Sequence, residues 1–125
     1  MHNNFFCKIP YINLYDKPSN NSKVGSQILY GEKFKILLKK KKFLKIKNSY
    51  DNYVGYIKLS NYINKFKPTH KISVLKSRIF KYPKNQVKYK SKNFLSFSSK
   101  IQIIKKNKNF LMFDNDKWLN IKNIK

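Results

Sequence analysis

The side chains of this chain that are best suited to covalent or metal chemistry are one thiol and two imidazoles. Cys7 is the only cysteine, and His2 and His70 are the only histidines. A cysteine nucleophile needs a histidine and a third orienting group, whereas a zinc site needs three or four ligands. These residues are too few and too scattered for either arrangement, so the sequence predicts no catalytic residue, no metal site and no cofactor. One cysteine excludes an intrachain disulfide, and Cys7 is interpreted as a partly buried thiol.

A carboxylate gives the first candidate for recognition rather than catalysis. Glu32 is the only glutamate in the chain, and a carboxylate is a natural partner for a peptide ammonium group. The alternative is a solvated side chain that offsets Lys33 or Lys35, and such an exposed pair contributes only about 0–1 kcal/mol. Both interpretations stay open at this point.

Aromatic side chains give the second candidate. Tyr53, Tyr56 and Tyr62 could line a peptide-binding groove, or they could form the packing and rim of a barrel. Trp118 is better explained as a large core residue or an anchor between modules than as a ligand platform. Whether these aromatic residues bind a ligand or pack in the core depends on the secondary-structure elements that carry them.

Those elements are predicted to be strands, because the apolar residues recur at every second position. Phe34, Ile36 and Leu38 are expected to point to one face while lysines point to the other. Gly31 is expected to mark a bulge or a sharp bend. The run 39–42 is predicted to be a hairpin tip, and residues 60–63 are predicted to form a single 3₁₀ turn.

The two halves of the chain repeat the same order of elements. Residues 33–36 correspond to 100–103, and residues 54–58 lie near the position of 117–120 in the second half. A repeat of about 60 residues suits a small barrel better than a solenoid unit. The predicted fold class is all-β, with two small barrels in tandem. The predicted boundaries are a loose leader over 1–8, a first module over 9–64, a linker over 65–69, and a second module over 70–125.

The charge of the chain suggests a polyanionic partner. Lysine and arginine number 29 against 5 acidic residues, which gives a formal net charge of +24. However, the chain has no alanine, only three glycines and a single arginine, Arg78, and it is rich in residues with AT-rich codons. Much of the lysine excess is therefore interpreted as drift on solvated faces. Almost no arginine is available for bidentate base recognition, so nucleic-acid binding is kept as an alternative.

The N-terminal segment and the hydropathy of the chain bear on location. No apolar run approaches the roughly 18–20 residues of a membrane span. Residues 1–10 lack the charged start and the apolar core of a secretory signal. The sequence therefore predicts a cytoplasmic protein without a membrane span.

Four segments of the first module carry a resemblance to a known family. They are YINLYDKPS, SQILYGEKFKIL, FLKIK and YVGYIKLSNYI. Together they resemble a bacterial SH3-like (SH3b) domain, and the second half resembles a shortened second copy in which Ser98 and Ser99 replace Gly31 and Glu32. Two such domains in succession resemble the N-terminal half of NlpC-type cell-wall cysteine peptidases, which cut γ-D-glutamyl–diamino-acid bonds.

This resemblance implies a function for the candidate residues. In that family the first SH3-like module contacts the free amine of a muropeptide through a Glu and a Tyr, which implies Glu32 together with Tyr53, Tyr56 or Tyr62. The family's catalytic cysteine follows the second module, whereas Cys7 precedes the first, so the chain is not expected to be an enzyme on its own. Its expected partner is a cell-wall peptide or a separately encoded papain-like catalytic domain. The alternatives are a basic barrel that binds nucleic acid non-specifically and a protein–protein adaptor.

Overall fold

The computed structural model describes residues 4–19, 21–59 and 62–125. Its regular structure there consists of strands, apart from two short 3₁₀ helices, η1 (Val87–Tyr89) and η2 (Ile121–Asn123). The all-β prediction is confirmed. The chain divides into two compact units, Met1–Phe66 and Lys67–Lys125, which we call unit 1 and unit 2. Within the described ranges, no helix has the length and apolar character needed to cross a membrane.

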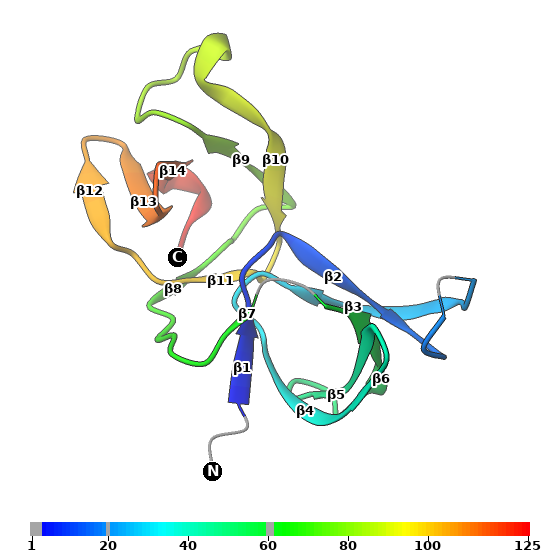
Figure 1. Cartoon of the computed structure of the whole chain (residues 1–125). Helices are drawn as coiled ribbons and strands as arrows, with labels where there is room; N and C mark the ends of the chain where they lie inside the picture. Colours follow the sequence, from blue (N-terminus) through cyan, green and yellow to red (C-terminus); the bar gives the residue numbers. More distant parts are fainter. Residues whose placement is uncertain (1–3, 20, 60–61) are drawn as a thin grey trace. The chain divides into compact units, whose positions relative to one another are not determined.

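Unit 1 is one antiparallel sheet of seven strands in the order β3-β2-β6-β5-β4-β1-β7, and Figure 1 shows it curling strongly. Its strands are β1 (Asn4–Cys7), β2 (Tyr11–Tyr15), β3 (Val24–Leu29), β4 (Lys33–Lys40), β5 (Phe43–Asn48), β6 (Val54–Lys58) and β7 (Tyr62–Ile63). Alternate residues of these strands turn inward, as period-two patterns require. The buried core consists of Cys7, Ile12, Leu14, Ile28, Phe34, Leu44, Ile46 and Ile57.

The N-terminal segment is part of this sheet, so the prediction of a loose leader over 1–8 is wrong for its described residues. β1 pairs with β4 on one side and with β7 on the other. Phe5 packs against the core, and Cys7 is fully buried within it. The segment has too few residues for a strand pattern to stand out, and tertiary pairing decides its conformation.

A β-bulge in β4 changes the predicted inward face. Ile36 pairs with Ile46, but the register then shifts so that Leu38 pairs with Lys45. A bulge rotates the strand beyond it, so Leu37 and Leu38 are 47% and 45% exposed. Phe34 and Ile36 face the core as predicted, whereas the prediction for Leu38 is wrong.

The turns of unit 1 follow local side-chain chemistry. Gly31 has a φ of 79°, a left-handed conformation that glycine adopts readily, and it makes the predicted bend between β3 and β4. Lys41 and Lys42 form the predicted hairpin tip between β4 and β5. The buried Asn48 side chain accepts a hydrogen bond from the N–H of Tyr50 (3.0 Å) and so organises the turn before β6. Two residues of the predicted 3₁₀ turn over 60–63 lie outside the described ranges, and its last two form β7.

Unit 2 contains a five-stranded antiparallel sheet in the order β10-β9-β14-β13-β12 and a two-stranded sheet, β11-β8. Its strands are β8 (His70–Lys71), β9 (Lys76–Phe80), β10 (Lys90–Ser96), β11 (Lys100–Ile101), β12 (Lys105–Asn107), β13 (Phe110–Asp114) and β14 (Lys117–Asn120). Apolar side chains are buried on both faces of the larger sheet, because neighbours such as Ile79 and Phe80 point in opposite directions and are both buried.

The alternation of KIQII predicts a strand over 100–104, but only Lys100–Ile101 (β11) of this range is a strand. β11 pairs with β8, whereas β12, which was predicted to be part of a turn over 105–109, pairs with β13. Between them, the N–H of Ile103 donates to the hydroxyl of Thr69 (3.1 Å), and the side chain of Gln102 accepts from the N–H of Lys67 (3.2 Å). These bonds replace the ladder bonds that a continuous strand would make.

Candidate peptide-recognition site

Glu32 is held rigidly at the bend between β3 and β4. Its Oε1 accepts a hydrogen bond from the N–H of Leu29 at 2.7 Å, and its own N–H donates to the carbonyl of Leu29 at 3.0 Å. The carbonyl of Glu32 accepts from the N–H of Cys7 at 3.1 Å. The side chain is only partly exposed. Glu32 is therefore neither a freely solvated residue nor a partner of the neighbouring lysines alone, since one carboxylate oxygen closes a turn.

Tyr53 lies at the start of β6, against the loop between β2 and β3. Its hydroxyl donates to Oδ1 of Asp16 at 3.3 Å, and its N–H donates to Oδ1 of Asp51 at 3.0 Å. Partial desolvation and the negative charge of Asp16 together raise the pKa of Tyr53 above its ordinary value. Gly25 leaves room for this arrangement, because a Cβ at that position would overlap the Tyr53 hydroxyl. Tyr53 thus fixes the loop that follows β2.

Tyr62 has a packing role. Its ring meets Phe5 edge to face with the centroids 5.2 Å apart, and it meets Phe34 in the same way at 5.9 Å. Edge-to-face pairs of this kind contribute about 0.5–1.5 kcal/mol beyond the area that they bury. These contacts agree with the interpretation of Tyr62 as a packing residue of the barrel and not as a residue that lines a groove.

Tyr56 lies on the outer face of the sheet, opposite the buried Gly55 and Ile57 in the strand alternation. It pairs directly with Tyr15 of β2. The ring of Tyr15 in turn meets Phe43 of β5 edge to face at 6.2 Å. We call Tyr15, Phe43 and Tyr56 the outer triad of unit 1. Lys58 places its Nζ 5.5 Å from the centre of the Tyr15 ring, so this aromatic surface has a cation beside it.

The four predicted residues therefore fall into separate surroundings. Glu32 closes the β3–β4 bend, Tyr53 holds Asp16, and Tyr62 packs in the core, so no shared hydrogen-bond network joins them in the described part of the chain. Tyr56 is partly exposed on the outer face of the sheet, beside Tyr15. Sequence reasoning missed Tyr15 and Phe43 as its companions. The available signal was the alternation of β2 and β6, which places both tyrosines on the face opposite the core.

The Cys7 thiol is unsuited to nucleophilic chemistry. It is fully buried, and Sγ donates to the carbonyl of Ile9 at 3.1 Å. Burial raises the pKa of Cys7 to about 12, and the nearby Glu32 carboxylate adds to the rise, although the bond to Ile9 opposes it. A thiol with this pKa stays protonated near neutral pH, whereas the reactive species is the thiolate. His2 lies outside the described residues, and His70 is exposed on β8 beside Thr69. The described residues also contain no group of three potential metal ligands.

Comparison with known proteins adds the family context. Residues 14–61 match the model of the bacterial dipeptidyl-peptidase Sh3 domain. This segment is therefore similar to an SH3 domain of that type. The matched range contains Glu32, Tyr53 and Tyr56. No curated protein matches the chain.

Two solved structures extend the comparison to both units. One is the crystal structure of an NlpC/P60 family protein from Bacillus cereus ATCC 10987, which is similar over 98% of this chain with a TM-score of 0.75 and 12% identity. The other is NlpC2 from Trichomonas vaginalis, with a TM-score of 0.40, 12% identity and coverage of 100% of this chain. The chain spans 55% and 48% of the lengths of these two proteins. The first likeness shows that both units share the fold of that structure, and the second is too weak to bear on it.

Proposed function

We propose that this protein is a non-catalytic SH3-like module pair that positions a cell-wall stem peptide, in the manner of the substrate-binding half of an NlpC-type peptidase. The match of residues 14–61 to a dipeptidyl-peptidase SH3 domain supports this proposal. The fold shared with an NlpC/P60 family protein supports it independently. The partner in cells is then either the peptide alone or a papain-like catalytic domain that acts on it.

The hydrogen-bonded carboxylate of Glu32 is the observation that supports this residue as the binding partner of the peptide amine. Because the Leu29 N–H holds Oε1, the carboxylate has one orientation before any ligand arrives. A preorganised acceptor loses little conformational entropy when it binds a peptide ammonium group. We assign the remaining oxygen, Oε2, to the ligand amine, and we assign a second contact to the partly exposed Tyr56.

A titration of ¹⁵N-labelled protein tests this assignment. The ligand is the tripeptide L-Ala–γ-D-Glu–diamino acid, and the matched control ligand is the same tripeptide with its amine acetylated. The free amine should shift the amide signals of Leu29 and Glu32 in a saturable manner, with an affinity on the order of millimolar or tighter. The tripeptide acetylated at its N-terminal amine should leave them unchanged, because it lacks the N-terminal ammonium group, whereas the side-chain amine of the diamino acid is present in both ligands.

The variant Glu32→Gln separates charge from structure. Glutamine retains an oxygen that accepts from the Leu29 N–H, so the bend should persist while the negative charge is lost. Binding of the free tripeptide should fall at least tenfold, as expected when one partner of a charged pair is removed. Lys92→Gln in unit 2 removes a charge from an exposed residue and should leave the affinity unchanged. Equal binding of both tripeptides, or full binding by Glu32→Gln, would refute the assignment.

A further inference from the structure

The outer triad of unit 1 has a counterpart at the same register in unit 2. Tyr15 pairs with Tyr56 in unit 1, and Phe80 pairs with Trp118 in unit 2. The rings of Phe80 and Phe110 meet edge to face at 5.2 Å, as those of Tyr15 and Phe43 do at 6.2 Å. We call Phe80, Phe110 and Trp118 the outer triad of unit 2. Both sheets thus carry aromatic side chains at corresponding positions, and in unit 2 these three residues form a buried cluster of their own.

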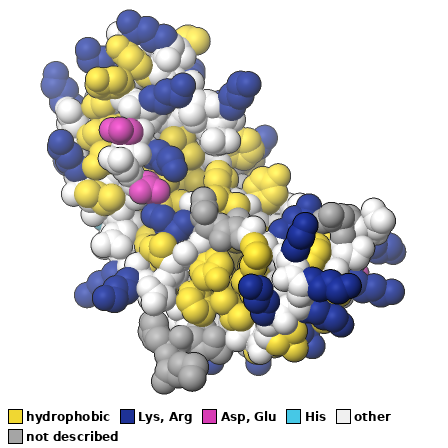
Figure 2. Space-filling model, in the orientation of Figure 1, with side chains coloured by type: hydrophobic (Ala, Val, Ile, Leu, Met, Phe, Trp, Pro, Cys, Tyr) yellow, Lys and Arg dark blue, Asp and Glu magenta, His cyan; other side chains and the backbone are white. Residues whose placement is uncertain are grey.

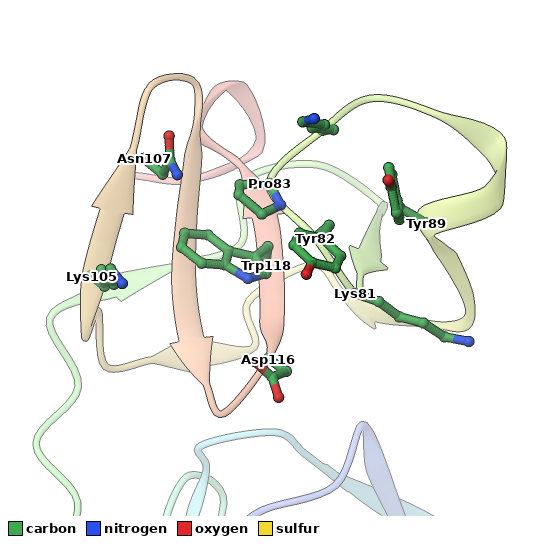
Figure 3. Close-up of a pocket in the computed structure, with 9 residues that line it drawn as sticks. Lys81, Tyr82, Pro83, Tyr89, Lys105, Asn107, Asp116 and Trp118 are labelled. Atoms are coloured by element: carbon green, nitrogen blue, oxygen red, sulfur yellow. The ribbon is translucent and has the colours of Figure 1, made fainter.

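The two units differ in the loop beside this triad. In unit 1 the loop over 16–23 is polar, whereas in unit 2 the loop over 81–89 carries Tyr82, Pro83 and Tyr89. Tyr89 packs against the triad of unit 2, and its ring centre lies 5.1 Å from that of Tyr82. The result is a groove of about 850 Å³ between this loop and the strands β12 and β14, shown in Figure 3. The residues lining it are Lys81, Tyr82, Pro83, Lys84, Tyr89, Lys105, Asn107, Asp116 and Trp118.

The groove combines aromatic walls with a positively charged rim. Figure 3 shows the indole of Trp118 beside Pro83 and Tyr82, which gives the groove an apolar centre. Around it, three lysines and one aspartate line the groove, which leaves a formal net charge of +2. Asn107 and Asp116 add groups able to bond to backbone amides. An occupant that fits this lining has an apolar side chain at its centre and carboxylates on either side.

We infer that this groove of unit 2 binds an extended, acidic polypeptide segment of a partner protein. Aromatic-lined grooves bind extended peptides, because the rings bury apolar groups while their polar edges and neighbours bond to the peptide backbone. Lysines at the rim attract carboxylates and align the segment along the groove. This site goes beyond the proposed function, which concerns the amine of a stem peptide at Glu32 in unit 1.

Two features argue against a nucleic-acid strand as the occupant. A base stacks on an open ring face, but Trp118 is only 6% exposed and the rings of Tyr82 and Tyr89 are inclined to each other by 53°. The Nζ of Lys88 also lies over one face of the Tyr89 ring, 5.1 Å from its centre.

The single tryptophan of the chain makes the test direct, because Trp118 lines the groove and all indole fluorescence comes from it. The probe is the acetylated, amidated hexapeptide DELPED, titrated into the full-length protein. The expected result is a saturable change in Trp118 emission, with amide shifts in residues 81–89, 105–107 and 116–118. The matched peptide KKLPKK keeps the apolar centre and reverses the charge, and it should not bind.

Two substitutions test the lining without endangering the fold, since both side chains are exposed. Tyr82 is 59% exposed, and Tyr82→Ala should weaken DELPED binding at least fivefold, as expected for an aromatic contact at the centre of an interface. Lys105→Gln should weaken binding about twofold to fivefold and reduce its salt dependence. Tyr50→Ala and Lys92→Gln replace exposed residues that do not line the groove, and they should bind like wild type.

Several outcomes would overturn the inference. The absence of a saturable change up to about 5 mM peptide, which is beyond even weak binding, is one of them. Equal binding of KKLPKK, or full binding by Tyr82→Ala, would also refute it. If the free stem tripeptide changes Trp118 emission and DELPED does not, the groove belongs to wall peptide and not to a protein segment. The signals of Leu29 and Glu32 report the proposed function separately, so either proposal can fail alone.

Discussion

At the residue scale, the ionisation of the Cys7 thiol should make the stability of unit 1 depend on pH. Its pKa is about 12 in the folded protein against 9.0 for an unperturbed thiol. Because the folded-state pKa is the higher one, the stabilising contribution is complete below pH 9 and is lost as the pH rises from about 9 to 12. The loss should reach about 1.4 kcal/mol per pH unit in that window. Denaturant unfolding at pH 8, 9 and 10 measures it.

The control for this prediction is Cys7→Ala. That variant loses packing at every pH, but its free energy of unfolding should decline less steeply above pH 9 than that of wild type, because tyrosines and lysines titrate in both proteins. A thiol reagent at pH 8 gives an independent check, since the native protein should react slowly and the denatured protein rapidly. Fast labelling of the native protein would contradict the burial of Cys7.

The candidate site shows which properties of a residue can be predicted from its type. The isolated carboxylate of Glu32 and the Gly31 bend before it stand out in the sequence, and both take part in the same turn. The different structural roles of the tyrosines could not be predicted from the sequence. Tyr53 and Tyr62 acquire their roles from Asp16 and Phe5, which are distant in sequence, and only tertiary pairing selects such partners.

At the element scale, the bulge in β4 should make two apolar residues of one hairpin respond very differently to truncation. Leu38 is 45% exposed beyond the bulge, whereas Ile46 on the neighbouring strand is fully buried. Ile46→Ala should lower the free energy of unfolding by about 2–5 kcal/mol, because it leaves a cavity in the core. Leu38→Ala should change it by no more than about 0.5 kcal/mol. Urea unfolding of the two variants measures both values.

This pair of variants also tests the bulge itself. If β4 continued in the regular alternation that its sequence suggests, Leu38 would point inward with Phe34 and Ile36. A large destabilisation by Leu38→Ala would therefore support the prediction that Leu38 faces the core. It would contradict the register shift between Ile36 and Leu38.

The strands themselves could be predicted wherever the alternation is long and has turn residues at its ends. β2, β3, β5, β6 and β13 follow such patterns, and the hairpin tip at Lys41 and Lys42 lies between β4 and β5. β1 and the division between β11 and β12 could not be predicted. β1 depends on pairing with β4 and β7, and the break near Ile103 depends on hydrogen bonds to residues 67–69. Nonlocal pairing overrides short local patterns in both cases.

At the scale of the whole molecule, the two compact units should each fold without the other. Each has its own buried residues, and the division falls between Phe66 and Lys67. Domains of about 60 residues are close to the lower limit for independent folding, so low stability is expected rather than failure to fold. The fragments 1–66 and 67–125 should each unfold cooperatively, and their amide spectra should overlay on that of the full chain away from residue 66. A disordered spectrum for either fragment would show that it needs the other.

The net charge of +24 predicts a second property of the whole molecule, which is weak binding to polyanions that does not depend on sequence. Figure 2 shows lysine and arginine side chains over both units instead of in one channel. Binding to a single-stranded oligonucleotide should be measurable at 50 mM salt by fluorescence anisotropy. It should fall about a thousandfold or more by 200 mM, because affinity from phosphate contacts alone depends on counterion release.

Measuring oligonucleotide affinity at physiological ionic strength distinguishes specific nucleic-acid binding from non-specific attraction by the net charge. Variants that reverse charge on the exposed hairpin tip, Lys41→Glu and Lys42→Glu, should weaken the binding at low salt no more than Lys92→Glu does in unit 2, because no single cluster dominates. Affinity that survives at about 150 mM salt, or that depends on one of these sites, would favour nucleic acid as a true partner. It would then weigh against the stem peptide, whose recognition at Glu32 requires an ammonium group.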